Sequence, residues 1–142
     1  MQQAAVYMKT EVNTSDNVRI ISMLYDGAIN FIRVAKKKME QNDRAGKGLY
    51  LVKATAIVAE LSSSLNMEAG GEVARNLRRL YDYVLDRLLY ANMKNDLKAF
   101  DDAEKILDVL RGAWQEIERG GAVAANIPIS KGANVVAMEL RV

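Results

Sequence analysis

Proline is the residue that most often interrupts an α-helix, and this chain of 142 residues contains only one, Pro128. A proline removes a backbone N–H donor and clashes with the preceding helical turn. Residues 1–127 contain none, so nothing there prevents long helices from forming. The spacing of the apolar residues then predicts where the helices lie.

The first predicted helix spans residues 16–41. Its apolar and small residues alternate by three and four, which places them on one helix face. They are Val18, Ile21, Tyr25, Ala28, Ile32, Ala35 and Met39, with Ile20, Leu24 and Phe31 beside them. Asp16 is the expected N-cap, with Thr14 and Ser15 as alternatives, because a short side-chain oxygen can accept a free amide of the first turn.

Three further helices are predicted at residues 44–66, 67–92 and 96–118. The second is expected to bury Leu49, Val52, Ala56 and Ala59, with Ile57, Leu61 and Leu65 alongside. The third is expected to bury Val73, Leu77, Leu80, Val84, Leu88 and Ala91, and the fourth Leu97, Phe100, Ala103, Leu107, Leu110, Trp114 and Ile117. Short connections make neighbouring helices antiparallel, so residues 16–118 are predicted to form an all-α, antiparallel, up-down-up-down four-helix bundle.

The two ends of the chain lack this period. Residues 1–15 carry apolar side chains without a long helical repeat, and we expect a short N-terminal cap segment. Residues 119–142 form a C-terminal tail. Its last apolar residues, Val136, Met138, Leu140 and Val142, alternate with other residues, which is typical of an extended segment. Disorder is the alternative for this tail.

The composition excludes most enzymatic chemistry. The chain has no His and no Cys, so the usual zinc sites, Ser-His-Asp and Cys-His nucleophiles and the Glu-x-x-His pairs of di-iron bundles are unavailable. We therefore expect no catalytic residue, no metal and no cofactor. One enzymatic alternative is a carboxylate pair, Asp26 and Asp82, although two solvated surface carboxylates are the simpler interpretation.

Charge and hydropathy predict neither a nucleic-acid nor a membrane partner. Twenty Lys and Arg residues against eighteen Asp and Glu leave a net charge of +2, which is too balanced to indicate either. No apolar run approaches the roughly 18 residues of a membrane span, and the N-terminus lacks the pattern of a signal peptide. The absence of Cys fits a reducing compartment. A cytoplasmic protein, monomeric or weakly dimeric, is expected.

Three local features of the sequence are not explained by the helical spacing of apolar residues alone. Gly27, in the middle of the first helix, costs about 1 kcal/mol relative to Ala, and indicates close approach by a neighbouring helix. Gly70 and Gly71 follow Asn66, although a helix-helix turn needs only one such residue. Tyr81 and Tyr83 point about 200° apart on a helix, so one of them should be exposed.

Taken in order, several strings resemble the FliS family, the flagellin-specific export chaperones. They are Val12–Thr14, Met23–Ile29, Ser63–Glu72, Asn76–Leu77, Leu80–Tyr83, Arg87–Leu88 and Ala91–Asp96. The resemblance runs from about residue 4 to 118. It departs from the family pattern at Asp16, Asn17 and Val18, where the family usually has Ser-Pro-Glu, and it stops before the tail.

The resemblance implies a helical bundle that binds the disordered C-terminal segment of flagellin in the cytoplasm. It would prevent premature polymerisation and deliver flagellin to the type III export apparatus, whose components are further partners. We expect the client in a groove between helices, lined by Leu24, Tyr25, Ile29, Met67, Leu77, Tyr81, Val84 and Leu88. Burial in the core is the alternative for the Leu, Ile and Val members.

The resemblance also implies a role for the N-terminus. A tyrosine-bearing segment would cover the empty client site as a lid, here formed by Val6, Tyr7 and Val12. The alternative function is a helical regulatory protein that captures a folded partner instead of an unfolded client.

Overall fold

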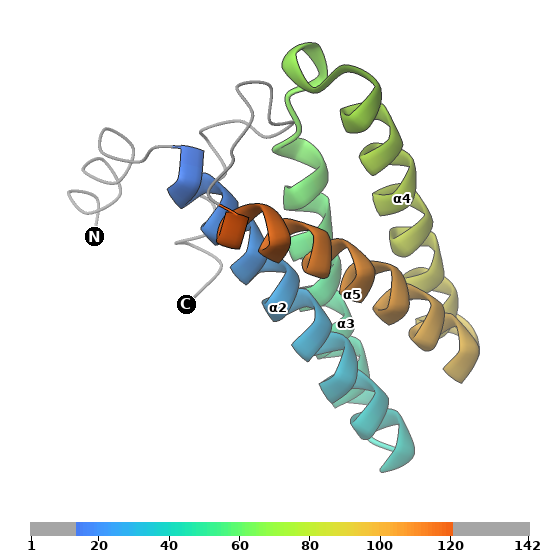
Figure 1. The fold of residues 1–142 in the computed structure, drawn as a ribbon. Coiled ribbons are helices and arrows are strands. Elements are labelled where there is room, and N and C mark those ends of the chain that lie inside the picture. The colour runs from blue at the N-terminus through green and yellow to red at the C-terminus, as the bar shows by residue number, and fades with distance from the viewer. Residues whose placement is uncertain (1–13, 121–142) are drawn as a thin grey trace, which may run out of the picture.

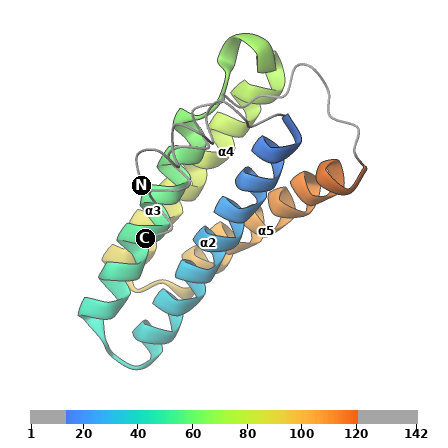
Figure 2. The same cartoon turned by 90° about the vertical axis from the view of Figure 1, so that its left-hand side faces the viewer.

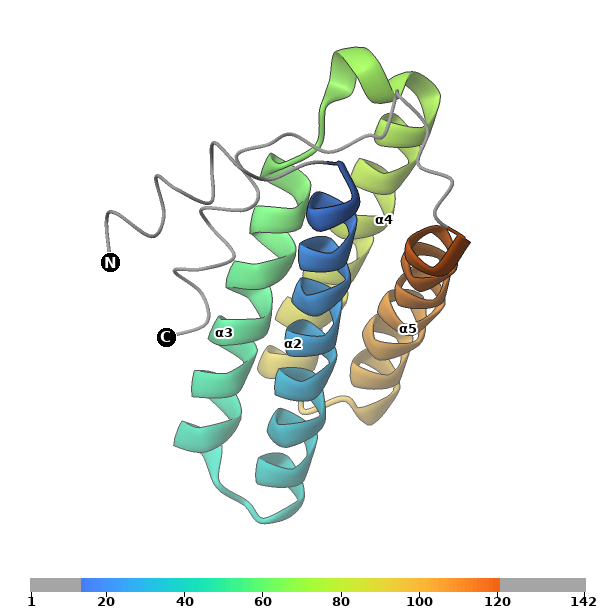
Figure 3. The same cartoon turned by 60° about the vertical axis from the view of Figure 1, so that its left-hand side comes forward.

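A computed structural model describes residues 14–120 of the chain, and these form four long helices. They are α2 (Thr14–Glu40), α3 (Arg44–Ser63), α4 (Met67–Lys94) and α5 (Leu97–Gly120). The helices run alternately down and up (Figures 1 and 3). The predicted antiparallel four-helix bundle is therefore confirmed for this part of the chain.

The helices form a closed square. Each one packs against two neighbours, so that α2 contacts α3 and α5, while α4 contacts α3 and α5. The helix pairs α2 and α4, and α3 and α5, lie diagonally opposite (Figure 2). The predicted cap segment and lid, residues 1–13, and the tail from residue 121 lie outside the described residues.

Short polar side chains cap the N-terminal ends of α3 and α4. The Asp43 side chain caps α3 by accepting a hydrogen bond from the Gly46 amide at 2.9 Å. Asn66 caps α4 in the same way by accepting from the Ala69 amide at 2.9 Å. The prediction that Asp16 caps the first helix was wrong, because α2 already begins at Thr14. Asp16 therefore lies in the first turn of α2.

The start of α4 is bent at Gly71. This residue has φ +52° and ψ −126°, a conformation inside the helix that side-chain-bearing residues rarely adopt. The turn made by Met67–Gly70 thus points in a different direction from the rest of α4, as the top of Figure 1 shows. The second glycine of the Gly70-Gly71 pair is explained by this bend.

The predicted core is confirmed for most of α2 and α5 and is wrong for one face of α3. On α2, Val18, Ile21, Tyr25, Ala28, Ile32 and Ala35 are fully buried. Gly27 faces α3, where a Cβ would lie 3.3 Å from Ile57 Cδ1, so the close approach is by a side chain and not by backbone. Val73 is exposed just after the bend at Gly71, Leu97 is exposed as the first residue of α5, and Leu80 is exposed at the margin of the buried face.

The outer side of α3 carries the residues that the sequence placed inside. Leu49 and Val52 are 53% and 65% exposed, and Ala56 and Ala59 are also exposed. The buried face of this helix is instead formed by Leu51, Ala54, Ile57, Val58 and Leu61, together with Lys47. Helix α3 has apolar residues on both faces, so its period could not indicate which one meets the core.

Candidate functional site

The eight residues predicted to line a client groove lie mainly in the core. Seven of them are buried, and only Met67, at the start of α4, is partly exposed. The seven are Leu24, Tyr25, Ile29, Leu77, Tyr81, Val84 and Leu88. They come from α2 and α4, which lie diagonally opposite, so they do not line an open groove between neighbouring helices in this structure.

Two of these residues form a polar cluster at the centre of the bundle. The hydroxyl groups of Tyr25 on α2 and Tyr81 on α4 are hydrogen-bonded to each other. Trp114 on α5 donates its indole Nε1–H to the Tyr25 hydroxyl at 3.1 Å. Three helices are therefore joined by hydrogen bonds inside an apolar core, where an unpaired hydroxyl would be costly.

Burial changes the acidity of both tyrosines. Desolvation raises the pKa of Tyr25 from 10.0 to about 12, with the hydrogen bonds from Tyr81 and Trp114 acting in the opposite direction. Burial also raises the pKa of Tyr81 well above its ordinary value, and the neighbouring Tyr25 adds to the shift. Both groups are neutral at physiological pH, so the cluster acts through hydrogen bonds and holds the helices in position.

Tyr83 lies on the opposite side of α4 from Tyr81 and is exposed, as the helical spacing predicted. The guanidinium of Arg87 lies over two rings, 5.8 Å from the Tyr83 centroid and 4.8 Å from that of Tyr90. Arg87 also reaches Asp86 at 3.4 Å. This outward face of α4 therefore combines aromatic rings with charge, and its rings are already partly covered by Arg87.

The outer face of α3 carries an exposed apolar stripe within residues 14–120. We define it by the residues Leu49, Val52, Ala56 and Ala59, which are spaced by three, four and three. This spacing forms one continuous stripe along a helix. Lys53 beside it lies over the rings of Phe31 and Tyr50, 5.6 Å from each centroid, instead of reaching across the stripe. Small alanines at one end and larger side chains at the other leave a surface that an apolar segment can cover.

The seam between α2 and α5 is different in character. Arg33 pairs with Glu104 at 2.8 Å, Lys36 reaches Asp101 at 2.6 Å, and Lys36 also contacts Glu104 at 3.3 Å. Hydrogen bonding to the carboxylates raises the pKa of the Arg33 and Lys36 side chains. This seam is closed by charge pairs, which makes it a poor surface for an apolar client.

The alternative carboxylate pair does not form an acid-base site. Asp26 forms an ion pair with Arg111 of α5 at 3.0 Å, while Asp82 is an exposed residue of α4 with no contact to Asp26. Within residues 14–120, no group of three or more Asp and Glu side chains is placed to hold a metal ion. No helix in the described part of the chain is long and apolar enough to cross a membrane.

The sequence is similar to known proteins over most of its length. The family described as flagellar protein FliS matches residues 1–121. The flagellar secretion chaperone FliS of Salmonella typhimurium is 39% identical over 115 residues, which is 80% of this chain and 85% of the relative. FliS of Bacillus subtilis is 34% identical over 110 residues, 78% of this chain and 81% of the relative. FliSB of Pseudomonas aeruginosa is 33% identical over 116 residues, 82% and 92% respectively.

Proposed function

The chain belongs to the FliS family of flagellar secretion chaperones, and from this membership we propose that it binds the disordered C-terminal segment of flagellin in the cytoplasm. The bound segment is kept from polymerising prematurely and is handed to the flagellar type III export apparatus. The protein acts by holding its client and makes or breaks no covalent bond.

The exposed apolar stripe on α3 is the part of the protein that we propose as the client-binding surface. An unfolded client loses conformational entropy when it binds, so it needs a surface that rewards many weak apolar contacts. Leu49 and Val52 supply such contacts at about 25 cal/mol for each Å² covered, and the alanines allow close approach. We propose that an apolar stretch of the client lies along this stripe, in the manner of a helix or extended segment docked on a helix face.

The residues predicted for the groove then have two roles. Met67 is partly exposed beside the bend in α4 and stays a candidate for direct contact with the client. The seven buried residues support the surface from within, and their direct contact with the client stays a prediction. The lid formed by Val6, Tyr7 and Val12 stays part of the proposal as well. Replacing Tyr7 by Ala should raise affinity for the client if the lid competes with it.

Calorimetric titration of the full chain with a peptide of the flagellin C-terminal segment, taken from the same genome, tests the proposal. Val52→Glu places a charge on the α3 stripe and should weaken binding roughly tenfold or more, or about 1.4 kcal/mol. Val109→Glu is the matched control, because Val109 lies on α5 and is 64% exposed against 65% for Val52. It should bind the peptide within about twofold of the unmodified chain.

The results distinguish an error in the identity of the client from an error in the binding surface. If the unmodified chain gives no heat with the peptide at micromolar concentration, flagellin is not the client. If it binds the peptide but Val52→Glu and Val109→Glu bind equally well, the client is right and the α3 stripe is not its site.

A further inference from the structure

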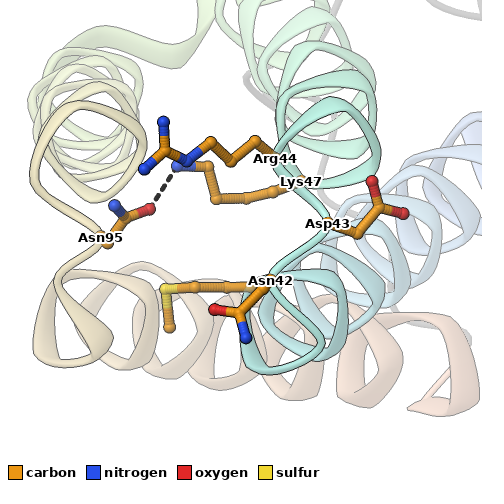
Figure 4. A pocket seen from close by; sticks show the side chains of 6 residues that line it. Asn42, Asp43, Arg44, Lys47 and Asn95 are labelled. Carbon is orange, nitrogen blue, oxygen red and sulfur yellow. Dashed lines mark hydrogen bonds between the residues drawn. The ribbon is translucent and has the colours of Figure 1, made fainter.

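A pocket of about 350 Å³ lies at the end of the bundle where the α2–α3 turn meets the α4–α5 turn. Figure 4 shows it from close by. It is lined by Met39, Asn42, Asp43, Arg44, Lys47 and Asn95. This pocket is separate from the tyrosine cluster in the core and from the α3 stripe. The proposed client site therefore gives the polar and charged residues of the pocket no role.

Lys47 is the central residue of this pocket. It is only 6% exposed, and no carboxylate of residues 14–120 pairs with it, which is unusual for a buried lysine. Its ammonium donates to the Asn92 carbonyl oxygen at 2.9 Å and to Asn95 Oδ1. These bonds tie α3 to the C-terminal end of α4, where the helix dipole favours a cation. An ammonium has three N–H donors, and these two acceptors leave one of them for the pocket.

Positive charge exceeds negative charge in the lining. The Arg44 side chain extends from α3 toward Asn95, on the same side as Lys47 (Figure 4). No ion pair or hydrogen bond of Arg44 is found within residues 14–120. The one acidic lining residue, Asp43, is already engaged, since it caps α3 through the Gly46 amide and lies 3.8 Å from Lys38. Lys47 and Arg44 together with Asp43 leave a positive local charge, which one bound anion would balance.

The remaining lining suits an amino-acid side chain. Asn95 uses its Oδ1 for Lys47, which leaves its NH₂ group free to donate, and Asn42 offers a second amide. Met39 is a partly buried apolar wall that can contact methylene groups. The volume is larger than a carboxylate group alone requires, so part of a flanking peptide fits as well.

We propose that this pocket binds the side chain of a glutamate or aspartate in an acidic segment of a partner polypeptide. The carboxylate contacts Lys47 and Arg44, the side chain lies against Met39, and the two asparagines bond the flanking peptide groups. A carboxylate carries a single negative charge, which the two cations of the pocket can balance. A phosphate fits less well, because Asp43 lines the same pocket and repels the additional negative charge of the phosphate.

Amide NMR spectra of the full chain at low ionic strength test this site. The probe is the blocked tripeptide acetyl-Ala-Glu-Ala-amide, with the Gln peptide, acetate and inorganic phosphate as comparisons. The Glu peptide should shift the amides of residues 42–47 and 92–96, and its affinity should exceed that of the Gln peptide and of acetate by roughly tenfold, since it alone combines charge with peptide groups. Equal affinity for the Gln peptide or for acetate overturns the proposal, as does tighter binding of phosphate.

Two variants complete the test. Arg44→Gln removes an exposed charge without touching the Lys47 bonds, and should weaken binding of the Glu peptide several-fold. Its matched control is Arg78→Gln, another exposed arginine, on α4 and 17 residues from Asn95, or roughly 25 Å along the helix. If Arg44→Gln binds the Glu peptide as well as Arg78→Gln does, the site is wrong. The α3 variants leave the pocket residues intact, so this proposal and the flagellin proposal fail separately.

Discussion

The hydroxyl groups of Tyr25 and Tyr81 are hydrogen-bonded to each other across the diagonal of the bundle, between two helices that are not neighbours. Trp114 brings a third helix into the same cluster. Neighbouring helices can slide along each other while keeping apolar contact, but a diagonal hydrogen bond exists in only one register. The cluster therefore specifies how α2, α4 and α5 are aligned.

Tyr25→Phe should lower the free energy of unfolding by about 1–3 kcal/mol, because it leaves both the Tyr81 hydroxyl and the Trp114 N–H buried without a partner. Tyr81→Phe should cost less, since Trp114 keeps its acceptor. Urea denaturation measures both. Tyr83→Phe is the control, as Tyr83 is exposed, and it should change stability by less than about 0.5 kcal/mol. If Tyr25→Phe changes the free energy of unfolding as little as the control does, the cluster does not contribute to stability.

Stability should fall in alkaline solution because of the same cluster. The folded state raises the pKa of Tyr25 from 10.0 to about 12, and that of Tyr81 in the same direction. Above pH 10 the unfolded chain releases protons that the folded chain still holds, so unfolding becomes more favourable as pH rises. Below pH 10 this contribution is fully present. For Tyr25 the loss is of order 2–3 kcal/mol by about pH 12.

Urea denaturation at a series of pH values, with tyrosinate absorbance followed in parallel, measures this effect. The fall in stability above pH 10 should be shallower in Tyr25→Phe than in the unmodified chain. Identical pH profiles would show that the buried hydroxyls do not control alkaline unfolding.

Gly71→Ala should destabilise the bundle by about 1–3 kcal/mol, because φ +52° and ψ −126° are strained for any residue with a side chain. A Cβ there would meet no neighbouring atom, so the cost is conformational and not steric crowding. Gly112→Ala is the opposite case, in an exposed part of α5 with open space, and should stabilise by about 0.5–1 kcal/mol. Thermal unfolding of the two variants should shift in opposite directions, and a common direction would contradict the bend.

Two valines on α3 test the orientation of that helix. Val58 is fully buried and Val52 is 65% exposed. Val58→Ala should cost about 2 kcal/mol in the free energy of unfolding, whereas Val52→Ala should change it by less than about 0.5 kcal/mol. The interpretation from sequence alone, with Val52 inside, requires the reverse order. Urea denaturation of the two variants decides between them.

The sequence predicted the fold class well because three of the four helices have apolar residues on one side. Val18, Ile21 and Tyr25 form a stripe that can only face inward, and Phe100, Ala103 and Leu107 form another. The helix boundaries were also close, with the second helix ending at Ser63 instead of residue 66 and the third at Lys94 instead of residue 92.

The surface could not be predicted in the same way. On α3 the inner and outer stripes are both apolar, and the choice depends on which one meets Gly27 and the neighbouring helices. The residues predicted to line the client groove are buried for a related reason. Tyr25 and Tyr81 are amphipathic and looked suited to binding, but each finds its polar partner on a helix that is distant in sequence. The pocket around Lys47 likewise forms only when two separate turns meet.

The two apolar faces of α3 also pose a problem for the folding chain. Rotating this helix by roughly half a turn would bury Leu49 and Val52 in place of Leu51 and Val58, but it would also exchange Ile57 and Leu61 for the smaller Ala56 and Ala59. A competing arrangement that keeps part of the apolar burial can trap a folding chain, and natural sequences usually avoid one. The Ile57 contact at Gly27 and the ammonium of Lys47 fit only one rotation. A helix that keeps an apolar face outside is thus oriented by a glycine and a buried lysine as well as by the larger side chains of its inner face.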